Sequence, residues 1–599
     1  MNSPEQLDIS HLIWQTKYRQ AESDEQSVEA SWRRIATALA AAEGSDADAW
    51  AERFYGFLEG FRFLPGGRIQ AGAGSPNQVT LFNCFVMGTI PDSLEGICDS
   101  LKEGALTMQQ GGGVGYDFSP LRPRGTVTRG AGTIASGPVS FMDVWNAMCA
   151  TLLSTGARRG AMMATLRCDH PDILEFIDAK TEPGRLQHFN LSVLVTDDLM
   201  QAVREDAPWP LVFPADQLGP GESVQTVERE WPGRGSIPCR VLRTLSAREL
   251  WNHIVGATYQ HAEPGVLFVD RINRDNNLYW REHIAATNPC GEIPLPPYGA
   301  CNLGSLNLVR YVREPFTPMA ELDYDTLATD CALAVRMLDN VTDVSGFPLP
   351  AQAQQARGSR RIGLGVTGLA DALMMLGEYY DSDQARQSAA DIMRILRDSA
   401  YRASVQLARE KGPFPHFDRA AYLQAPFVQG LPEDIREAIE EHGIRNSHLL
   451  AIAPTGTISL LAGNVSSGIE PVFADHQVRK VLLPDSGNRS LTLEDYACRL
   501  WRQAPRRCAV PPAYADALSL EPRAHLAMQA ALQPYVDNAI SKTINIPADY
   551  PFEAFREVYE RAWRMGLKGC TTYRPNDVTG SVLESGSASH CCDAEREGD

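Results

Sequence analysis

The sequence lacks several features that would place it in familiar classes of protein. No stretch approaches the roughly 18 consecutive apolar residues of a membrane-spanning helix. The first residues have neither the basic segment nor the apolar segment of a secretory signal, so we expect a cytoplasmic protein. The thirteen cysteines are odd in number and few for a chain of this length, which is not the pattern of a disulfide scaffold. They include no CxxC pair, so a zinc site is not expected either.

The chain is also poor in positive charge. Its 55 Lys and Arg residues stand against 74 Asp and Glu residues, for a formal net charge of −19. Nucleic acids and anionic membranes are both polyanions, so neither is an expected partner. An anionic nucleotide would need a local site of positive charge or a helix terminus. At 599 residues, the chain is long enough for two or more domains or one large barrel.

The most informative stretch is residues 287–308. Asn288, Cys290 and Glu292 lie two residues apart, and in an extended segment this spacing would direct all three side chains to one face. Several prolines between them and Cys301 exclude a helix. The pattern predicts an amide, a thiol and a carboxylate in one small volume. A buried loop with two unreactive cysteines is the alternative, because free cysteine is often a small core residue.

The segment Asn288-Pro-Cys-Gly-Glu292, followed by a cysteine eleven positions after Cys290, resembles the finger loop of ribonucleotide reductases. The resemblance implies an α/β fold, a ten-stranded α/β barrel with a central finger loop, preceded by a helical N-terminal region. It also implies a thiyl radical on Cys290, with Glu292 as the base and Asn288 holding the substrate. Cys84, in the strand-like run 79–87, and Cys301 would be the reducing thiol pair. From sequence alone, Cys84 could equally be a core residue.

The resemblance divides the chain into three parts. Residues 1–75 would form the helical region, and residues 76–580 the catalytic barrel with its effector-binding loops. Residues 581–599 are rich in Ser, Gly and acidic residues and are expected to form a flexible redox tail. The tail carries Cys591 and Cys592, which could shuttle electrons to the active site by thiol exchange. Tails of the family usually separate these cysteines.

Two stretches resemble phosphate-binding loops, and only the first predicts phosphate binding. An apolar run leads into Pro454-Thr-Gly-Thr457 and a second apolar run follows, which predicts a cradle at a helix start. The resemblance assigns substrate phosphates to Pro454, Thr455, Gly456 and Thr457. The alternative is that a threonine only caps its own helix. The glycine-rich segment 111–115 lacks the Lys-Ser/Thr of a P-loop, and the resemblance places it beside the active site.

Residues 363–368, Gly-Leu-Gly-Val-Thr-Gly, fit the dinucleotide-binding pattern GxGxxG literally. That fingerprint also requires a preceding strand and an acidic residue about 20 positions further on at a strand end. Residues 357–362 do not suggest such a strand, and Asp381 and Asp383 stand in a helix-capping context. An NAD-dependent oxidoreductase is therefore an unfavoured alternative.

Loops elsewhere resemble the allosteric parts of the family. The resemblance assigns a deoxynucleotide or ATP effector to Asp92, Arg158, Arg159, Lys180, Arg185 and Gln187. From the residues alone, Asp92 and Ser93 could cap the helix that follows, a role compatible with effector binding. The two adjacent arginines could form a basic surface turn instead. Residues 201–245 are rich in Pro and Gly and are expected to be irregular.

The radical source follows by elimination within the family. A separate metal-containing radical subunit would require two adjacent tyrosines near the C-terminus, and residues 569–574 contain one. No glycyl-radical motif is present, which leaves adenosylcobalamin as the expected cofactor. The expected reaction is reduction of ribonucleotides, as diphosphates or triphosphates, to 2′-deoxyribonucleotides. A thioredoxin-type protein is the expected reductant, and the enzyme is expected to form a homodimer. The alternatives are the large subunit of a metal-radical-dependent reductase and a non-catalytic glycine-rich barrel.

Overall fold

The structure is a computed structural model in which the chain forms two compact units. The first unit contains the described residues up to Asn83 together with Ala300–Asn545. The second contains Cys84–Gly299 and the described residues from Ile546 onward. The described residues are 9–20, 25–77, 79–127, 134–154, 158–159, 161–182, 184–218, 225–483, 487–503 and 510–575. The expected tail, 581–599, lies outside them, and the three-part division of the chain stays a prediction.

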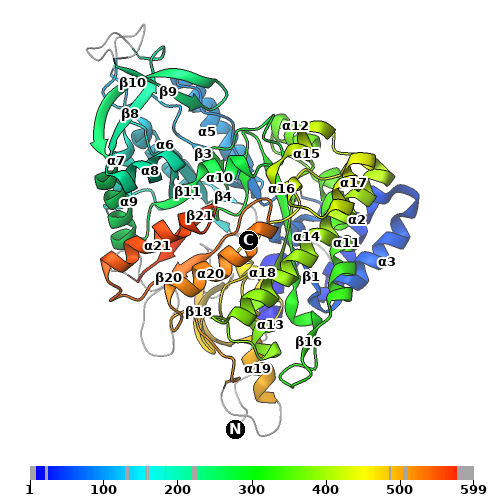
Figure 1. Ribbon diagram of the computed structural model, residues 1–599. Helices are drawn as coiled ribbons and strands as arrows, with labels where there is room; N and C mark the ends of the chain where they lie inside the picture. The colour runs from blue at the N-terminus through cyan, green and yellow to red at the C-terminus, as the bar shows by residue number, and fades with distance from the viewer. Residues whose placement is uncertain are drawn as a thin grey trace. The chain divides into compact units, whose positions relative to one another are not determined.

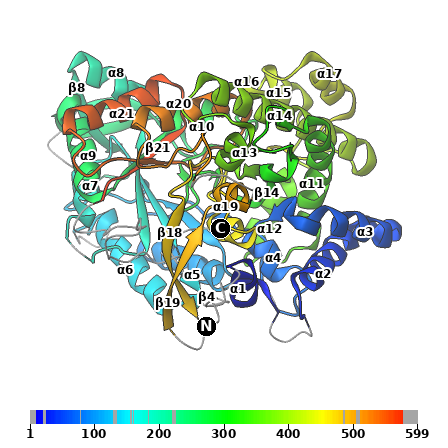
Figure 2. The same cartoon turned by 90° about the horizontal axis from the view of Figure 1, so that it is seen from below.

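Helices open the first unit, as the apolar spacing indicates. Figures 1 and 2 show α2 and α3 side by side. Trp32 and Leu39 of α2 and Phe54 and Phe57 of α3 are buried, because they recur at helical spacing on the inner face of each helix. The N-terminal elements are α1 (Ile9–Ile13), a π-helix (Trp14–Tyr18), α2 (Val28–Ala40), α3 (Ala47–Leu58) and α4 (Gly67–Gly72).

A sheet follows in the same unit. Strand β14 (Ala300–Asn307) pairs antiparallel with β1 (Phe63–Pro65) and parallel with β17 (Ile362–Thr367). Every residue of β14 and β17 is buried, as expected for strands covered on both faces. Short strands of this unit are β15 (Val312–Arg313), β16 (Glu321–Leu322) and β20 (Thr543–Asn545), and β18 (His476–Leu483) pairs with β19 (Gly487–Glu494).

Helices surround this sheet, and α11 and α14 run side by side in both views (Figures 1 and 2). Polar N-caps start the longest ones, since the side chains of Asp323 and Ser382 accept backbone N–H groups of α11 and α14. The helices are α11 (Tyr324–Val344), α12 (Pro350–Ser359), α13 (Leu369–Leu376), α14 (Asp383–Lys411), α15 (Arg419–Gln424), α16 (Pro426–Gln429), α17 (Glu433–His442), α18 (Gly456–Leu461), α19 (Tyr496–Gln503) and α20 (Pro522–Leu532).

The GxGxxG segment lies within a buried strand. Residues 363–367 belong to β17, and only Gly368 stands in the turn before α13. A Cβ on Gly365 would lie 2.3 Å from the carbonyl oxygen of Ala451, so this glycine permits close approach of two backbones. Asp383 begins α14 and is not at a strand end. The segment therefore has a packing role and not the geometry of a dinucleotide site.

The second unit is built on a parallel sheet. Strands β2 (Cys84–Val86), β3 (Gly113–Asp117), β6 (Met162–Arg167), β7 (Phe189–Val195) and β11 (Gly265–Phe268) are neighbours in that order. The strand expected at 79–87 is therefore shorter, since β2 covers only Cys84–Val86. Strand β21 (Gly569–Tyr573) pairs antiparallel with β11. The helices are α5 (Leu94–Gln109), α6 (Pro138–Thr151), α7 (Ile173–Ile177), α8 (Asp197–Glu205), α9 (Ala247–His261), α10 (Val269–Arg274) and α21 (Phe552–Arg564).

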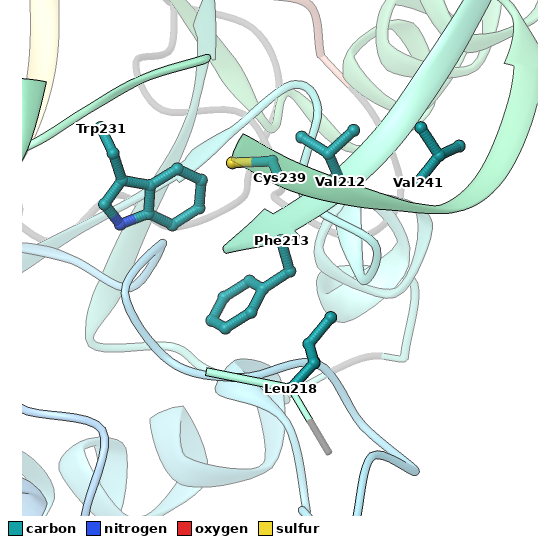
Figure 3. Packing of buried hydrophobic residues seen from close by; sticks show 6 residues of the cluster. All are labelled: Val212, Phe213, Leu218, Trp231, Cys239 and Val241. Carbon is teal, nitrogen blue, oxygen red and sulfur yellow. The ribbon is translucent and has the colours of Figure 1, made fainter. Parts of the chain in front are cut away.

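The prediction that residues 201–245 are irregular is wrong. They include an antiparallel sheet of β8 (Pro208–Pro214), β10 (Gly235–Ser246) and β9 (Thr226–Trp231), in that order. Figure 3 shows the core of this sheet, in which the Phe213 and Trp231 rings meet edge to face at 5.5 Å. Its other buried members are Val212, Leu218, Cys239 and Val241. Burial of these apolar side chains explains why a Pro- and Gly-rich stretch is ordered.

No helix in the described part of the chain is both long enough and apolar enough to cross a lipid bilayer.

Candidate functional site

The finger loop is a β-hairpin in the second unit. Strand β12 (Ala286–Thr287) pairs with β13 (Pro294–Leu295), and residues 288–293 form the connecting loop. The N–H of Gly291 donates to the carbonyl oxygen of Asn288 at 3.1 Å, and Gly291 has φ +85°. The tip is therefore a turn, so the prediction of an extended segment is wrong. Asn288 and Glu292 converge because the chain reverses between them.

Cys84 joins these two side chains. The Asn288 amide Nδ2 donates to Cys84 Sγ at 3.3 Å. The Cys84 thiol in turn donates to Glu292 Oε1, with Sγ 3.7 Å from that oxygen. The carboxamide of Asn288 is itself fixed, because its Oδ1 accepts the N–H of Ile293 at 3.0 Å. All three site side chains are buried. The structure thus places a thiol, an amide and a carboxyl from positions 84, 288 and 292 in mutual contact.

Glu292 has an unusual environment for a carboxyl group. Its side chain is 1% exposed, and Oε2 has no hydrogen-bond partner among the described residues. Burial raises the pKa of Glu292 from 4.5 to about 7, against the opposing effect of hydrogen bonds from Asn288, its own backbone and Cys84. A carboxyl group with a pKa near neutrality can exchange a proton at physiological pH.

Cys290 differs from its neighbours in exposure. It stands at the turn of the hairpin and is partly exposed, whereas Cys84 and Glu292 are buried. A Cβ built on the adjacent Gly291 would meet no atom within 4 Å. The backbone of the tip is therefore not packed against other atoms at Gly291, and Cys290 is partly accessible to solvent.

Three residues of the parallel sheet fix the finger. Thr165 Oγ1 of β6 donates to the Ala285 carbonyl at 2.7 Å, and Asn190 Nδ2 of β7 donates to the Pro289 carbonyl at 2.9 Å. A Cβ on Gly115 of β3 would lie 1.9 Å from the Thr287 carbonyl oxygen, so only glycine permits this contact. Thr165 and Asn190 were not among the site residues predicted from the sequence. The available signal was a polar residue inside each of two apolar strands.

Cys301 lies in the first unit, on β14. It is fully buried, and its Sγ donates to the carbonyl oxygen of Asn302 at 3.3 Å. The two predicted reducing thiols, Cys84 and Cys301, therefore belong to different units. Their pairing stays a prediction.

The segment 454–457 is held by a network of hydroxyl groups in the first unit. Thr455 precedes α18 with φ +54°, and its side chain does not cap that helix, so the capping alternative is wrong. Thr455 Oγ1 instead lies 2.9 Å from Thr367 Oγ1 and accepts the N–H of Gly468 at 2.7 Å. Thr367 Oγ1 also donates to the Ser466 carbonyl at 3.0 Å. The cradle is thus fixed from outside α18.

A buried carboxyl pair supports this network. Asp371 accepts the backbone N–H of Ser466 at 2.5 Å and that of Ala497 at 2.9 Å. Asp495 accepts the N–H of Cys498 at 3.0 Å. Burial, followed by the negative charge of Asp371, raises the pKa of Asp495 well above its usual value. Asp495 is therefore the neutral partner, which donates its proton to Asp371.

Comparison with known proteins decides the family. Residues 82–573 match the family model of the ribonucleotide reductase barrel domain, and residues 8–78 match that of the ribonucleotide reductase all-alpha domain. The chain belongs to the ribonucleotide reductase family. The expected α/β barrel with a preceding helical region is therefore confirmed, and the enzyme is an oxidoreductase that acts on ribonucleotides.

Individual relatives support the same assignment. A vitamin B12-dependent ribonucleoside-diphosphate reductase of Mycobacterium tuberculosis is 38% identical, over 96% of this chain and 79% of the relative. One from Thermoplasma acidophilum is 35% identical, over 91% of this chain and 68% of the relative. A ribonucleoside-diphosphate reductase subunit alpha of Chlamydia pneumoniae is 27% identical, over 90% of this chain and 56% of the relative.

The predicted effector residues of this reductase all come from the second unit. Asp92 forms an ion pair with Arg122, whose Nε donates at 2.7 Å, while Ser93 caps α5 by accepting the Gly96 N–H. The capping role therefore applies to Ser93 and not to Asp92.

The neighbouring effector candidates make separate contacts. Lys180 pairs with Glu263, and Arg185 pairs with Asp143 of α6 at 3.0 Å. Gln187 is exposed. The backbones of Arg158 and Arg159 form β5, which pairs with β4 (Leu153–Ser154). The ion pairs of Asp92, Lys180 and Arg185 share no residue with one another. Cys591 and Cys592 lie outside the described residues.

Proposed function

We propose that this reductase converts ribonucleoside diphosphates to 2′-deoxyribonucleotides through a thiyl radical on Cys290, in an adenosylcobalamin-dependent reaction. The observation that carries the proposal is the contact of Asn288, Cys84 and Glu292 beside the turn that bears Cys290. Diphosphate is the proposed form of the substrate because relatives at 35–38% identity are named as diphosphate reductases. A cytoplasmic location belongs to the same proposal, since the chemistry needs reduced thiols.

Two lines of support favour cobalamin over a radical subunit. The relatives at 35–38% identity are named vitamin B12-dependent, whereas the subunit alpha is 27% identical. Cys290 is partly exposed and the adjacent Gly291 is not packed against other atoms, so a cofactor could contact the chain at these two residues. When bound there, adenosylcobalamin would supply the radical that takes the hydrogen atom from the Cys290 thiol. The tip residues Cys290 and Gly291 are those that would face it.

Three side chains of the finger loop then have separate roles in the reaction. The Cys290 radical removes the 3′ hydrogen of the ribose, and Glu292 accepts the proton of the 3′-hydroxyl group as the 2′-hydroxyl leaves as water. The raised pKa of Glu292 suits a group that must take up and return a proton near pH 7. Asn288 orients the substrate from its fixed place beside Cys84. The same hydrogen atom returns to C3′, which restores the radical on Cys290.

Reduction at C2′ takes two electrons, and we assign them to Cys84 and Cys301. Two thiols become one disulfide, which releases two electrons and two protons, so the reaction balances with one water per deoxynucleotide. Cys591 and Cys592 would then reopen the disulfide by exchange, and a thioredoxin-type protein would reduce them in turn. The contact of Cys84 with both Asn288 and Glu292 supports its place at the reacting carbon.

Substrate phosphates are assigned to Pro454, Thr455, Gly456 and Thr457. Support comes from the fixed, left-handed conformation of Thr455 and from its two hydroxyl contacts, which hold the loop independently of α18. Backbone N–H groups at such a turn suit an anion.

The effector is assigned to Asp92, Arg158, Arg159, Lys180, Arg185 and Gln187. A homodimer is proposed as well. Leu94 and Leu106 of α5 and Val144 of α6 are 71%, 40% and 47% exposed, and these apolar side chains are candidates for its contact surface.

The decisive experiment measures deoxynucleotide formation from a ribonucleoside diphosphate with a small dithiol as reductant. Turnover should require adenosylcobalamin and should be abolished by Cys290→Ser, while the exposed-thiol control Cys98→Ser keeps wild-type activity. Turnover that is indifferent to cobalamin but appears with a metal-containing radical subunit would establish the alternative reductase class. A Cys290→Ser variant with a tenth of the wild-type rate would refute the assigned radical site.

A further inference from the structure

The return limb of the finger contains a residue in a conformation that its side chain disfavours. The N–H of Gly299 donates to the Pro296 carbonyl at 2.8 Å, which closes a turn over residues 296–299. Tyr298 is the third residue of this turn and has φ +60°. Turns with proline at the second position normally place Gly or Asn third, because a larger residue is disfavoured there. A tyrosine in this position therefore needs compensating contacts.

The side chain of Tyr298 has such contacts. Its Oη donates to the carboxylate of Glu103 on α5, at 3.1 Å to Oε2 and 3.4 Å to Oε1. Its ring lies directly against Gly88, since a Cβ there would be 2.3 Å from Cζ of the ring. Any residue other than glycine at position 88 would displace the tyrosine. Tyr298 is thus held between α5 and the segment that follows β2.

The position of Tyr298 matters for the site because of its neighbours. The carbonyl oxygen of Gly299 accepts the N–H of Val86 at 3.0 Å, which fastens the return limb to β2. Val86 is two residues from Cys84, and Cys84 contacts Asn288 and Glu292. A shift of the Tyr298 turn would therefore act on the hydrogen bond that aligns the finger with the strand of Cys84.

Helix α5 connects this contact to the proposed effector site. Asp92 and Ser93 stand at its start, and Glu103 lies ten residues after Ser93, about 15 Å along a helix. The helix is seated tightly, because a Cβ on Gly104 would lie 1.7 Å from the Tyr116 hydroxyl of β3. Because α5 is one continuous helix over Leu94–Gln109, we expect a displacement at Asp92 to reach Glu103.

We propose that Tyr298 is a positioning residue that, through its hydrogen bond to Glu103, transmits effector binding at the start of α5 to the finger loop. The inference rests on the proposed function for the identity of the effector site. The Tyr298 hydroxyl acts through its hydrogen bond to Glu103, and its role is to couple α5 to the limb that ends at β2. Effector binding that moves α5 changes the alignment of Cys84 with Asn288 and Glu292, and with it the choice of substrate.

The test compares Tyr298→Phe, Glu103→Leu and Glu103→Gln in the full-length enzyme, with adenosylcobalamin and a small dithiol. The phenylalanine keeps the ring against Gly88 and removes only the hydroxyl. The wild-type enzyme should change its ratio of two substrates by roughly 5–150-fold when a deoxynucleoside triphosphate is added. Tyr298→Phe and Glu103→Leu should reduce this response to about 2-fold or less, with effector affinity measured by dialysis unchanged within about 3-fold.

Glu103→Gln supplies the rescue arm. The glutamine carbonyl still accepts from Tyr298, so this variant should retain a clearly larger response than Glu103→Leu. A role limited to stability would instead lower basal turnover and thermal stability in all three variants and leave the effector response intact. A full response in Tyr298→Phe, or identical responses in Glu103→Gln and Glu103→Leu, would overturn the proposal.

A second readout does not depend on turnover. Addition of the deoxynucleotide should change hydrogen exchange of the amides in residues 285–299 in the wild-type enzyme and not in Tyr298→Phe. An equal change in both proteins, or no change in the wild type, overturns the relay. Absence of deoxynucleotide formation by the wild-type enzyme would refute the proposed function separately, because exchange reports the coupling alone.

Discussion

The pH dependence of catalysis should follow the ionisation of Glu292. The rise in its pKa from 4.5 to about 7 corresponds to about 3 kcal/mol in favour of the protonated form, and burial is the main cause. A base must be deprotonated to act, so the active fraction increases with pH. About 10% of Glu292 is ionised at pH 6 and about 90% at pH 8. Below pH 7, kcat/KM should therefore fall about tenfold per pH unit.

The assay is a single turnover of pre-reduced enzyme between pH 5.5 and 8.5, which removes the pH dependence of the external reductant. Glu292→Gln should lower the rate by roughly 100–10,000-fold, and any residual activity should lose the acid limb. Glu433→Gln, on the exposed face of α17, is the matched control and should keep the wild-type profile. A wild-type rate that stays constant down to pH 5.5 would refute the assignment of Glu292 as a base with a raised pKa.

Three further predictions concern the rest of the molecule. Asp495→Asn should become increasingly more stable than wild type in thermal unfolding as pH rises above the ordinary carboxyl pKa of about 4, because burial raises the pKa of Asp495 in the folded protein and folding must then take up a proton that the unfolded chain has lost. A stability difference that does not change with pH would contradict this. Thr455→Val should raise KM for the substrate with little change in kcat, because the Gly468 N–H loses its acceptor at a cost of about 1–3 kcal/mol. Thr455→Ser keeps a hydroxyl acceptor and should restore the wild-type KM. A double Cys591→Ser, Cys592→Ser variant should turn over with a small dithiol and fail with a thioredoxin-type protein; normal turnover with the protein would exclude the shuttle.

The sequence predicted the chemistry of the finger better than its shape. The residue types at 288, 290 and 292 were sufficient to predict a thiol, an amide and a carboxyl group in one place, and two of them do meet at Cys84. Their spacing of two suggested an extended strand. The left-handed conformation of Gly291 turns the chain instead, and a period-2 spacing cannot distinguish these two cases.

The sheet of β8–β10 escaped prediction for a different reason. Pro and Gly are frequent in residues 201–245 and suggest loops. The strands form because β8 pairs with β10, and a stretch of chain separates these two strands in the sequence. A signal was present in β9, where Thr226, Glu228 and Glu230 are exposed and alternate with Val227 and Trp231 on the packed face. Contacts such as Tyr298 with Glu103 are also beyond sequence reasoning, because they join residues 195 positions apart.

The pairing of β21 with β11 has a consequence for the synthesis of the chain. Phe268 ends β11, and its antiparallel neighbour begins only at Gly569, about 300 residues later. At roughly 5–20 residues per second, a ribosome needs about 15–60 s to cover that interval. During this time one edge of β11 has no partner from β21, and exposed edges template association with other chains. The nascent protein therefore carries an aggregation-prone edge for most of the time it takes to complete its second half.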